Sequence, residues 1–107
     1  MGGPQMAIEI PKPLPTTFLS AQNYPNPFTS ATTISYALPK SSHVTLNVYN
    51  AAGQLVSTLV DQELGAGYYT AEWDRTGRFG NRVPSGIYSY RLQAGDFTST
   101  KKMILLR

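Results

Sequence analysis

The chain has 107 residues and a net charge of +3 at pH 7, with 14% charged and 11% aromatic residues. This length supports one domain with a single core, and nine Gly and eight Pro favour short strands and turns over helices. The mild basicity, without a basic run interleaved with aromatics, argues against nucleic-acid binding. The lack of cysteine excludes disulfides and thiolate metal sites, and no apolar run reaches the about 18 residues of a membrane-spanning helix.

Residues 1–16 are predicted to be a Pro-rich linker or the remnant of a longer polypeptide. Prolines recur at every second position from Pro11 to Pro15, a pattern that favours extended polyproline geometry. The folded domain is predicted to span residues 17–107. Its first segment contains Pro25 and Pro27, which cannot both donate to a β-ladder, so this segment is predicted to be an edge strand or a bulged one.

Six further runs alternate apolar and polar residues with the period of a β-strand. They cover approximately residues 33–38, 44–48, 54–61, 69–73, 87–92 and 97–106. Turn residues separate them, including Gly53 at a position that is predicted to need a positive φ. Together with the edge segment, these runs predict an all-β, immunoglobulin-like sandwich of about seven antiparallel strands.

The stretch from Trp73 to Leu92 is predicted to be a strand, a crossing loop and a second strand. Tyr88, Tyr90 and Leu92 share one face of the second strand by the two-residue period, so this face is predicted to be buried. Trp73, the only tryptophan of the chain, is predicted to meet the two tyrosines from the facing sheet.

Few residues suggest chemistry, and the chain is not predicted to be an enzyme. His43 is the only histidine and is predicted to lie at a solvent-facing strand end, and one histidine without cysteine does not supply the ligands of a zinc site. The carboxylates are scattered, and Asp74 is predicted to cap a turn or to pair with an arginine of its loop. No catalytic residue, cofactor or metal is therefore predicted. Exposed tyrosines leave a weak carbohydrate contact open; the candidates are Tyr24, Tyr49 and Tyr68.

Four blocks in fixed order resemble the type A C-terminal sorting domain of type IX secretion substrates. These blocks are Tyr24-Pro-Asn-Pro-Phe28, residues 48–56, residues 83–88 and residues 101–105. The block from Trp73 to Tyr90 is also similar to the immunoglobulin-like domain of the flagellar hook-capping protein.

The resemblance implies a non-catalytic address label on a protein exported by Bacteroidetes. Such domains direct an upstream cargo to the outer-membrane type IX translocon, and a sortase-like peptidase removes many of them. The implied location is the periplasm in transit and then the cell surface or the medium. By position, the implied signal residues are Gly86, Tyr88, Lys101, Lys102, Met103, Ile104 and Leu105. Two alternatives remain open: a carbohydrate-binding or structural accessory module of a secreted glycoside hydrolase, and a hook-cap-type assembly domain.

The last run has two apolar faces. Met103 and Leu105 point to one side and Ile104 and Leu106 to the other, so one face is predicted to lie on the domain while the second is either available to a partner or buried at the sandwich seam. If this strand is at an edge, Lys101 and its neighbour Lys102 are predicted to deter unintended pairing and to leave the edge open to a receptor strand. The simpler alternative is a closing strand without a signal.

Overall fold

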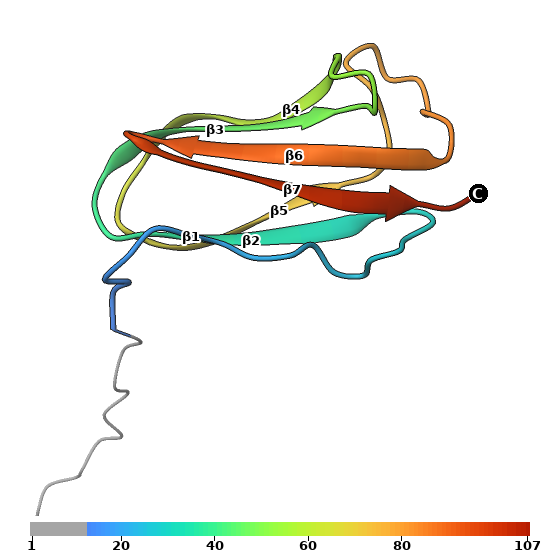
Figure 1. Cartoon of the computed structure of the whole chain (residues 1–107). Helices are drawn as coiled ribbons and strands as arrows, with labels where there is room; N and C mark the ends of the chain where they lie inside the picture. Colours follow the sequence, from blue (N-terminus) through green and yellow to red (C-terminus); the bar gives the residue numbers. More distant parts are fainter. Residues whose placement is uncertain (1–12) are drawn as a thin grey trace, which may run out of the picture.

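A computed structural model describes residues 13–107, in which seven strands form two facing sheets (Figure 1). One sheet has three strands in the order β1 (Leu19–Ser20), β2 (Thr32–Leu38) and β5 (Gly67–Trp73). The other has four strands in the order β4 (Leu55–Leu64), β3 (Ser42–Tyr49), β6 (Gly86–Ala94) and β7 (Phe97–Leu105). All paired strands are antiparallel, and no helix occurs within the described residues. The predicted fold class is confirmed.

The first predicted segment is indeed an edge strand, since β1 has two residues and pairs only with β2. Most of the predicted linker, residues 1–12, lies outside the described residues. Residues 13–16 belong to no strand, and the side chain of Leu14 is 63% exposed.

The strands form where apolar residues alternate, and the inward faces of both sheets make one core. Val44, Leu46 and Val48 on β3 are fully buried, as the period of two predicts. The turn after β3 is held by Asn50, whose Oδ1 accepts hydrogen bonds from the backbone N–H groups of Ala52 and Gln54. Gly53 in this turn has the predicted positive φ, at 83°.

Trp73 is the centre of the core at one end of the sandwich. Its indole is 1% exposed and lies edge-on to the rings of Phe28 and Tyr88, with centroids 5.7 and 5.2 Å away. The indole N–H donates to the backbone carbonyl of Thr76 at 2.9 Å. The predicted contact across the sheets is therefore confirmed for Tyr88. Tyr90 is also fully buried, but it makes no ring contact with Trp73.

Ala37 departs from the predicted alternation. It alternates with the inward residues Ile34, Tyr36 and Leu38 on β2 and so lies on the outer face, yet its side chain is only 2% exposed. The register explains this burial, because Ala37 stands opposite Leu19 on one side and Tyr68 on the other. The two larger side chains flank the small one on the outer face of the sheet.

The segment between β1 and β2 closes one side of the sandwich by pairing with β7. The N–H of Phe28 donates to the carbonyl of Ile104 at 3.0 Å, and the N–H of Leu106 donates to the carbonyl of Phe28 at 2.8 Å. Phe28 and Leu105 form a parallel bridge. The three-stranded sheet is thus joined to the edge of the four-stranded sheet through residues 22–28.

Arg75 is a buried cation at the foot of the crossing loop. Its residue is 9% exposed, and its guanidinium donates to the carbonyls of Thr29 and Val83, both at 2.9 Å, and of Leu106 at 3.4 Å. Arg75 holds a positive φ of 60°, which a non-glycine residue adopts only when its surroundings stabilise it. One side chain therefore connects three chain segments that are distant in sequence.

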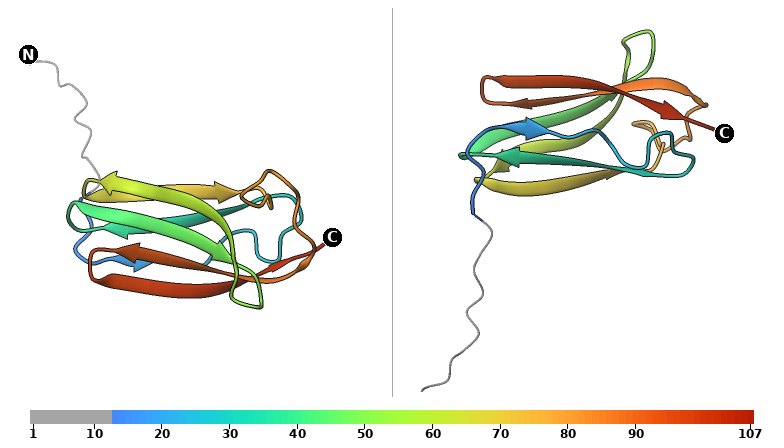
Figure 2. Two further views of the ribbon diagram at one scale, coloured as in Figure 1. Left: turned by 90° about the horizontal axis from the view of Figure 1, so that it is seen from above. Right: turned by 60° about the horizontal axis from the view of Figure 1, so that its bottom comes forward.

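The two ends of the sandwich carry different segments (Figure 2). The first described residues enter at one end, which we call the linker end, and the C-terminus lies at the opposite end, which we call the tail end. The turns at the linker end are 39–41, 65–66 and 95–96. The tail end carries the turn 50–54, the crossing loop 74–85 and residues 106–107.

We expect the stability of the domain to fall between about pH 10 and pH 12. Burial raises the pKa of Tyr36, Tyr88 and Tyr90, and it raises the pKa of Tyr90 to about 12. An unfolded tyrosine titrates near pH 10, so above this pH the native state retains protons that the unfolded state has released. The contribution of these protonated tyrosines to the free energy of unfolding is complete below pH 10 and is lost as the pH rises through 12. Urea unfolding at a series of pH values measures this loss, and a constant midpoint up to pH 12 would contradict it.

Candidate partner-binding surface

The structure brings the implied signal residues together on the β6–β7 hairpin. Gly86 stands opposite Leu105 and Tyr88 opposite Met103. Blocks separated by some fifteen positions in sequence thus become cross-strand neighbours, about 5 Å apart between their Cα atoms. The sequence prediction placed a tight turn between these two strands but did not give their register.

Three of these side chains belong to the core. Met103 and Leu105 are 0% and 1% exposed, and Tyr88 is 5% exposed, with its hydroxyl donating to the carbonyl of Pro84 at 2.6 Å. A partner that binds the folded domain cannot contact these three buried side chains. Their contribution is to hold the hairpin in place, as predicted for the inward face of the last strand.

The outward face of the hairpin presents an apolar pair. Ile87 and Ile104 stand directly opposite each other and are 53% and 42% exposed. Ser89 and Lys102 form the next outward pair. We call these four residues the β6–β7 patch. The sequence analysis did not name Ile87 as a candidate. Its outward direction was nevertheless predictable, because it directly precedes the inward residue Tyr88 in the alternation.

Two shallow hollows of about 250 and 260 Å³ border the β6–β7 patch. Both lie between β6 and the turn that follows β3, with Asn50 and Ala51 on one wall and Ile87 on the other. Lys102 lines the second hollow and places an ammonium group beside the apolar pair. The surface can therefore receive an apolar group that carries a negative charge or a hydrogen-bond acceptor nearby.

Lys101 and Lys102 differ in their surroundings, although the same role as edge charges was considered for both. Lys102 is exposed, but Lys101 shares the inward direction of Met103 and Leu105 and is half-buried at the margin of the sandwich. An inward-pointing charge on an edge strand disfavours pairing with another chain. Only Lys102 of the two is fully accessible to a partner.

Of the two alternatives for the last strand, an edge open to a receptor strand does not apply to its final residues. The side chain of Gln22 donates to the carbonyl of Lys102 at 2.8 Å, and Asn26 Oδ1 accepts the N–H of Ile104 at 2.9 Å. With Phe28 these groups occupy the edge from Lys102 to Leu106. The sequence could not show this, because proline-rich segments reveal little about what they pair with.

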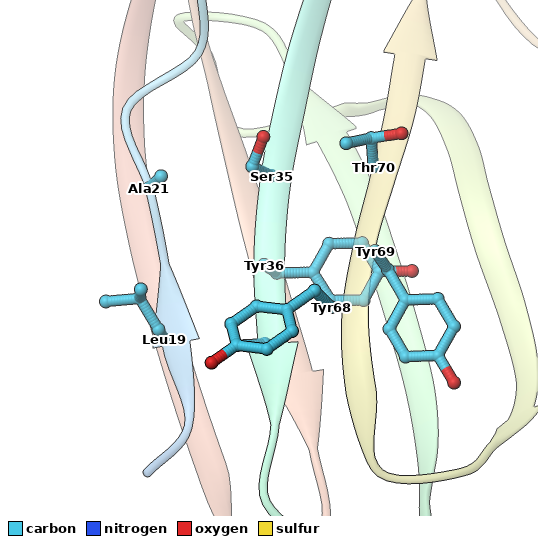
Figure 3. Close-up of a pocket in the computed structure, with 8 residues that line it drawn as sticks. Leu19, Ala21, Ser35, Tyr36, Tyr68, Tyr69 and Thr70 are labelled. Atoms are coloured by element: carbon cyan, nitrogen blue, oxygen red, sulfur yellow. The ribbon is translucent and has the colours of Figure 1, made fainter. Parts of the chain in front are cut away.

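A second candidate surface lies on the outer face of the three-stranded sheet. A groove of about 290 Å³ runs across it, and Figure 3 shows Leu19 and Tyr68 on the same side of the sheet. Tyr68 is 47% exposed, and hydroxyl groups from Ser35 and Thr70 line the groove. Tyr24, 80% exposed, forms an isolated antiparallel bridge with Thr33 of the same sheet. These residues fit the carbohydrate alternative.

Tyr49 does not fit that alternative, although it was predicted to be exposed. Its ring is half-buried beneath the guanidinium of Arg91, 5.0 Å from the ring centroid, and its hydroxyl accepts from Asn47. This arrangement covers the face that a sugar would stack on.

The titratable side chains do not assemble a catalytic or metal centre within residues 13–107. His43 is exposed as predicted, with its ring nitrogens 2.8 Å from Asp61 and 3.5 Å from Glu63. No group of three such residues in this range has metal-binding geometry. Asp74 accepts a hydrogen bond from the hydroxyl of Thr76. No helix in the described range is long and apolar enough to cross a membrane.

The fold and the hairpin surface place the chain among immunoglobulin-like sandwich domains. The model of the FlgD Ig-like domain matches residues 21–96, and the chain belongs to this family. FlgD from P. aeruginosa is 29% identical with a TM-score of 0.55, over 69% of this chain and 57% of that one. No curated protein matches the chain.

Two solved structures from Porphyromonas gingivalis have the same fold. Latent dimeric PorU is 21% identical with a TM-score of 0.66, and the match covers 81% of this chain and 9% of PorU. PorZ, described as an essential surface component of the type IX secretion system, is 22% identical with a TM-score of 0.57, over 80% of this chain and 11% of PorZ. The chain is therefore comparable to one small part of each of these proteins.

Proposed function

We propose that residues 17–107 form a non-catalytic sorting domain that directs an upstream cargo through the type IX translocon. The observation that carries this proposal is the exposed pair of Ile87 and Ile104 on the hairpin that also holds the implied signal residues. The fold shared with PorU and PorZ supports a link to this secretion system. The family match ends at residue 96, so β7 lies beyond what the chain shares with the family model.

On this proposal, the two faces of the hairpin have different roles. Tyr88, Met103 and Leu105 are buried and keep the strands in register, while the β6–β7 patch is accessible. A receptor that reads this face recognises the folded domain, since the pair forms only when β6 and β7 align. The partners on this proposal are the outer-membrane translocon and a sortase-like peptidase, and the cargo reaches the cell surface or the medium.

We expect the double change Ile87→Ser with Ile104→Ser to reduce delivery of a reporter to the cell surface about tenfold or more. Truncating central apolar residues of an interface commonly has this effect. The reporter is fused to residues 17–107 and expressed in a type IX-competent cell, and surface and periplasmic fractions are compared. Leu55→Ser, at a 37% exposed position on β4, is the matched control.

Thermal unfolding separates recognition from folding in this experiment. Both isoleucines are about half exposed, so the double change is expected to leave most of the stability in place. A variant that folds like the wild type and is still delivered normally contradicts a role of the β6–β7 patch. Failure of the unchanged domain to deliver the reporter contradicts the sorting function itself.

The accessory-module alternative has its own observation, the tyrosine-lined groove on the three-stranded sheet. On the sorting proposal, we expect that titration with soluble and insoluble polysaccharides detects no saturable binding. Binding that is abolished by Tyr68→Ala and retained by Phe79→Ala would instead favour a carbohydrate module.

A further inference from the structure

The crossing loop presents an aromatic side chain that the fold does not use. Phe79 is 86% exposed, the largest exposed fraction among the large apolar side chains of residues 13–107. The guanidinium of Arg78 lies 5.3 Å from the centroid of its ring, and the residue borders a hollow of about 170 Å³ that Leu55 and Val56 also line. The core is complete without this ring, so its position calls for another explanation.

The loop holds Phe79 in a defined position. The N–H of Gly77 donates to the carbonyl of Asn81 at 2.8 Å, and the N–H of Gly80 donates to the carbonyl of Gly77 at 3.0 Å. These bonds make a small hairpin that is anchored below by the indole of Trp73 and by Arg75. Phe79 therefore stands at the tip of an ordered projection at the tail end.

Cations surround the tip. Arg78 and Arg82 are both exposed on the same small hairpin. The nearest carboxylate in the sequence, Asp74, is engaged by the hydroxyl of Thr76 at the foot of the loop. Glu72, exposed on β5, is the other carboxylate on the chain segment that leads into the loop. The remaining described carboxylates lie on β4 and in the β6–β7 turn; they are Asp61, Glu63 and Asp96.

We propose that the tip made by Arg78, Phe79 and Arg82 binds an anionic phospholipid surface. Phenylalanine enters the boundary between headgroups and acyl chains, and arginines beside it pair with lipid phosphates. A specific protein interface buries about 800 Å² on each partner in complementary shapes, which a narrow convex tip does not supply. A fluid headgroup layer adapts to a convex tip, and charge complementarity selects anionic lipids. This inference does not depend on the sorting role.

The test uses the 107-residue chain and flotation with two kinds of vesicle, phosphatidylcholine alone and phosphatidylcholine mixed with phosphatidylglycerol. We expect binding only to the anionic vesicles, with loss at high salt. Each arginine is expected to contribute about fivefold, the factor for roughly 1 kcal/mol, so Arg78→Ala with Arg82→Ala weakens binding about 25-fold. Phe79→Ala is also expected to weaken it. Lys40→Ala and Leu14→Ala, exposed residues at the linker end, are the matched controls.

A tryptophan at the tip reports insertion directly. Trp73 is buried and stays unchanged, so an emission shift of Phe79→Trp to shorter wavelength on anionic vesicles arises at the tip. Equal binding to both kinds of vesicle, no binding to either, or binding that survives the tip variants overturns the proposal. Preferential capture of polyglutamate over anionic vesicles would overturn it in favour of an acidic protein partner.

Discussion

Trp73→Ala is expected to destabilise the domain by about 3–5 kcal/mol, the range for removing a large aromatic side chain from a core. The indole is 1% exposed, and its loss leaves a cavity between Phe28 and Tyr88, which come from different parts of the chain. It also leaves the carbonyl of Thr76 without its donor. A domain of about 90 residues has little stability to spare, so much of it would be unfolded at 37 °C.

Urea unfolding followed by circular dichroism measures this loss, since the variant lacks the only tryptophan. Trp73→Phe keeps an aromatic ring but not the hydrogen bond, and it is expected to fall between the wild type and Trp73→Ala. Phe79→Ala removes an exposed ring from the following loop and is expected to change stability by less than about 0.5 kcal/mol. A loss below about 1 kcal/mol for Trp73→Ala would show that the indole is not a core residue.

Arg75→Met is expected to cost about 2–4 kcal/mol, because it leaves the carbonyls of Thr29 and Val83 without their donors. Methionine retains much of the apolar stem, so the loss reports chiefly on the hydrogen bonds. Arg75→Lys keeps the charge, but a single ammonium cannot reproduce the guanidinium fork, and we expect it to restore only part of the stability.

The local effect of this change distinguishes it from general destabilisation. Arg75 also reaches the carbonyl of Leu106, so hydrogen exchange of the Leu106 N–H is expected to accelerate more than that of β3. Arg78→Met, an exposed arginine in the same loop, is the matched control and is expected to stay within about 0.5 kcal/mol of the wild type. Unchanged unfolding of Arg75→Met would show that the buried guanidinium contributes no net stability.

The regular parts of the fold were predictable because strands carry a local pattern. The alternation predicted that Met103 and Leu105 share one face and that Ile104 and Leu106 share the other. The structure buries the first pair and exposes the second. The same pattern separated the inward Tyr88 from its neighbours. Side-chain direction in a strand depends only on the period of two, so it can be read without knowledge of the rest of the chain.

Contacts made by loops could not be predicted in this way. Nothing local distinguishes Arg75, which is buried, from Arg78, which is exposed three residues later. The pairing of Phe28 with the edge of β7 joins positions nearly eighty residues apart, and no turn signal links them. The exposed pair of the β6–β7 patch could be predicted only in part. The outward direction of each isoleucine follows from the alternation, but the register that sets them opposite each other does not.

The way in which residues 22–28 lie along β7 governs how the domain bears mechanical load. The two segments run in the same direction, and the chain enters at the linker end and leaves at the tail end. Pulling on the first and last described residues therefore drags these neighbours in opposite senses along their length. The hydrogen bonds between them are loaded together in shear, instead of opening one after another as in a zipper. A load applied between the linker end and the tail end therefore acts along the stiff direction of the sandwich.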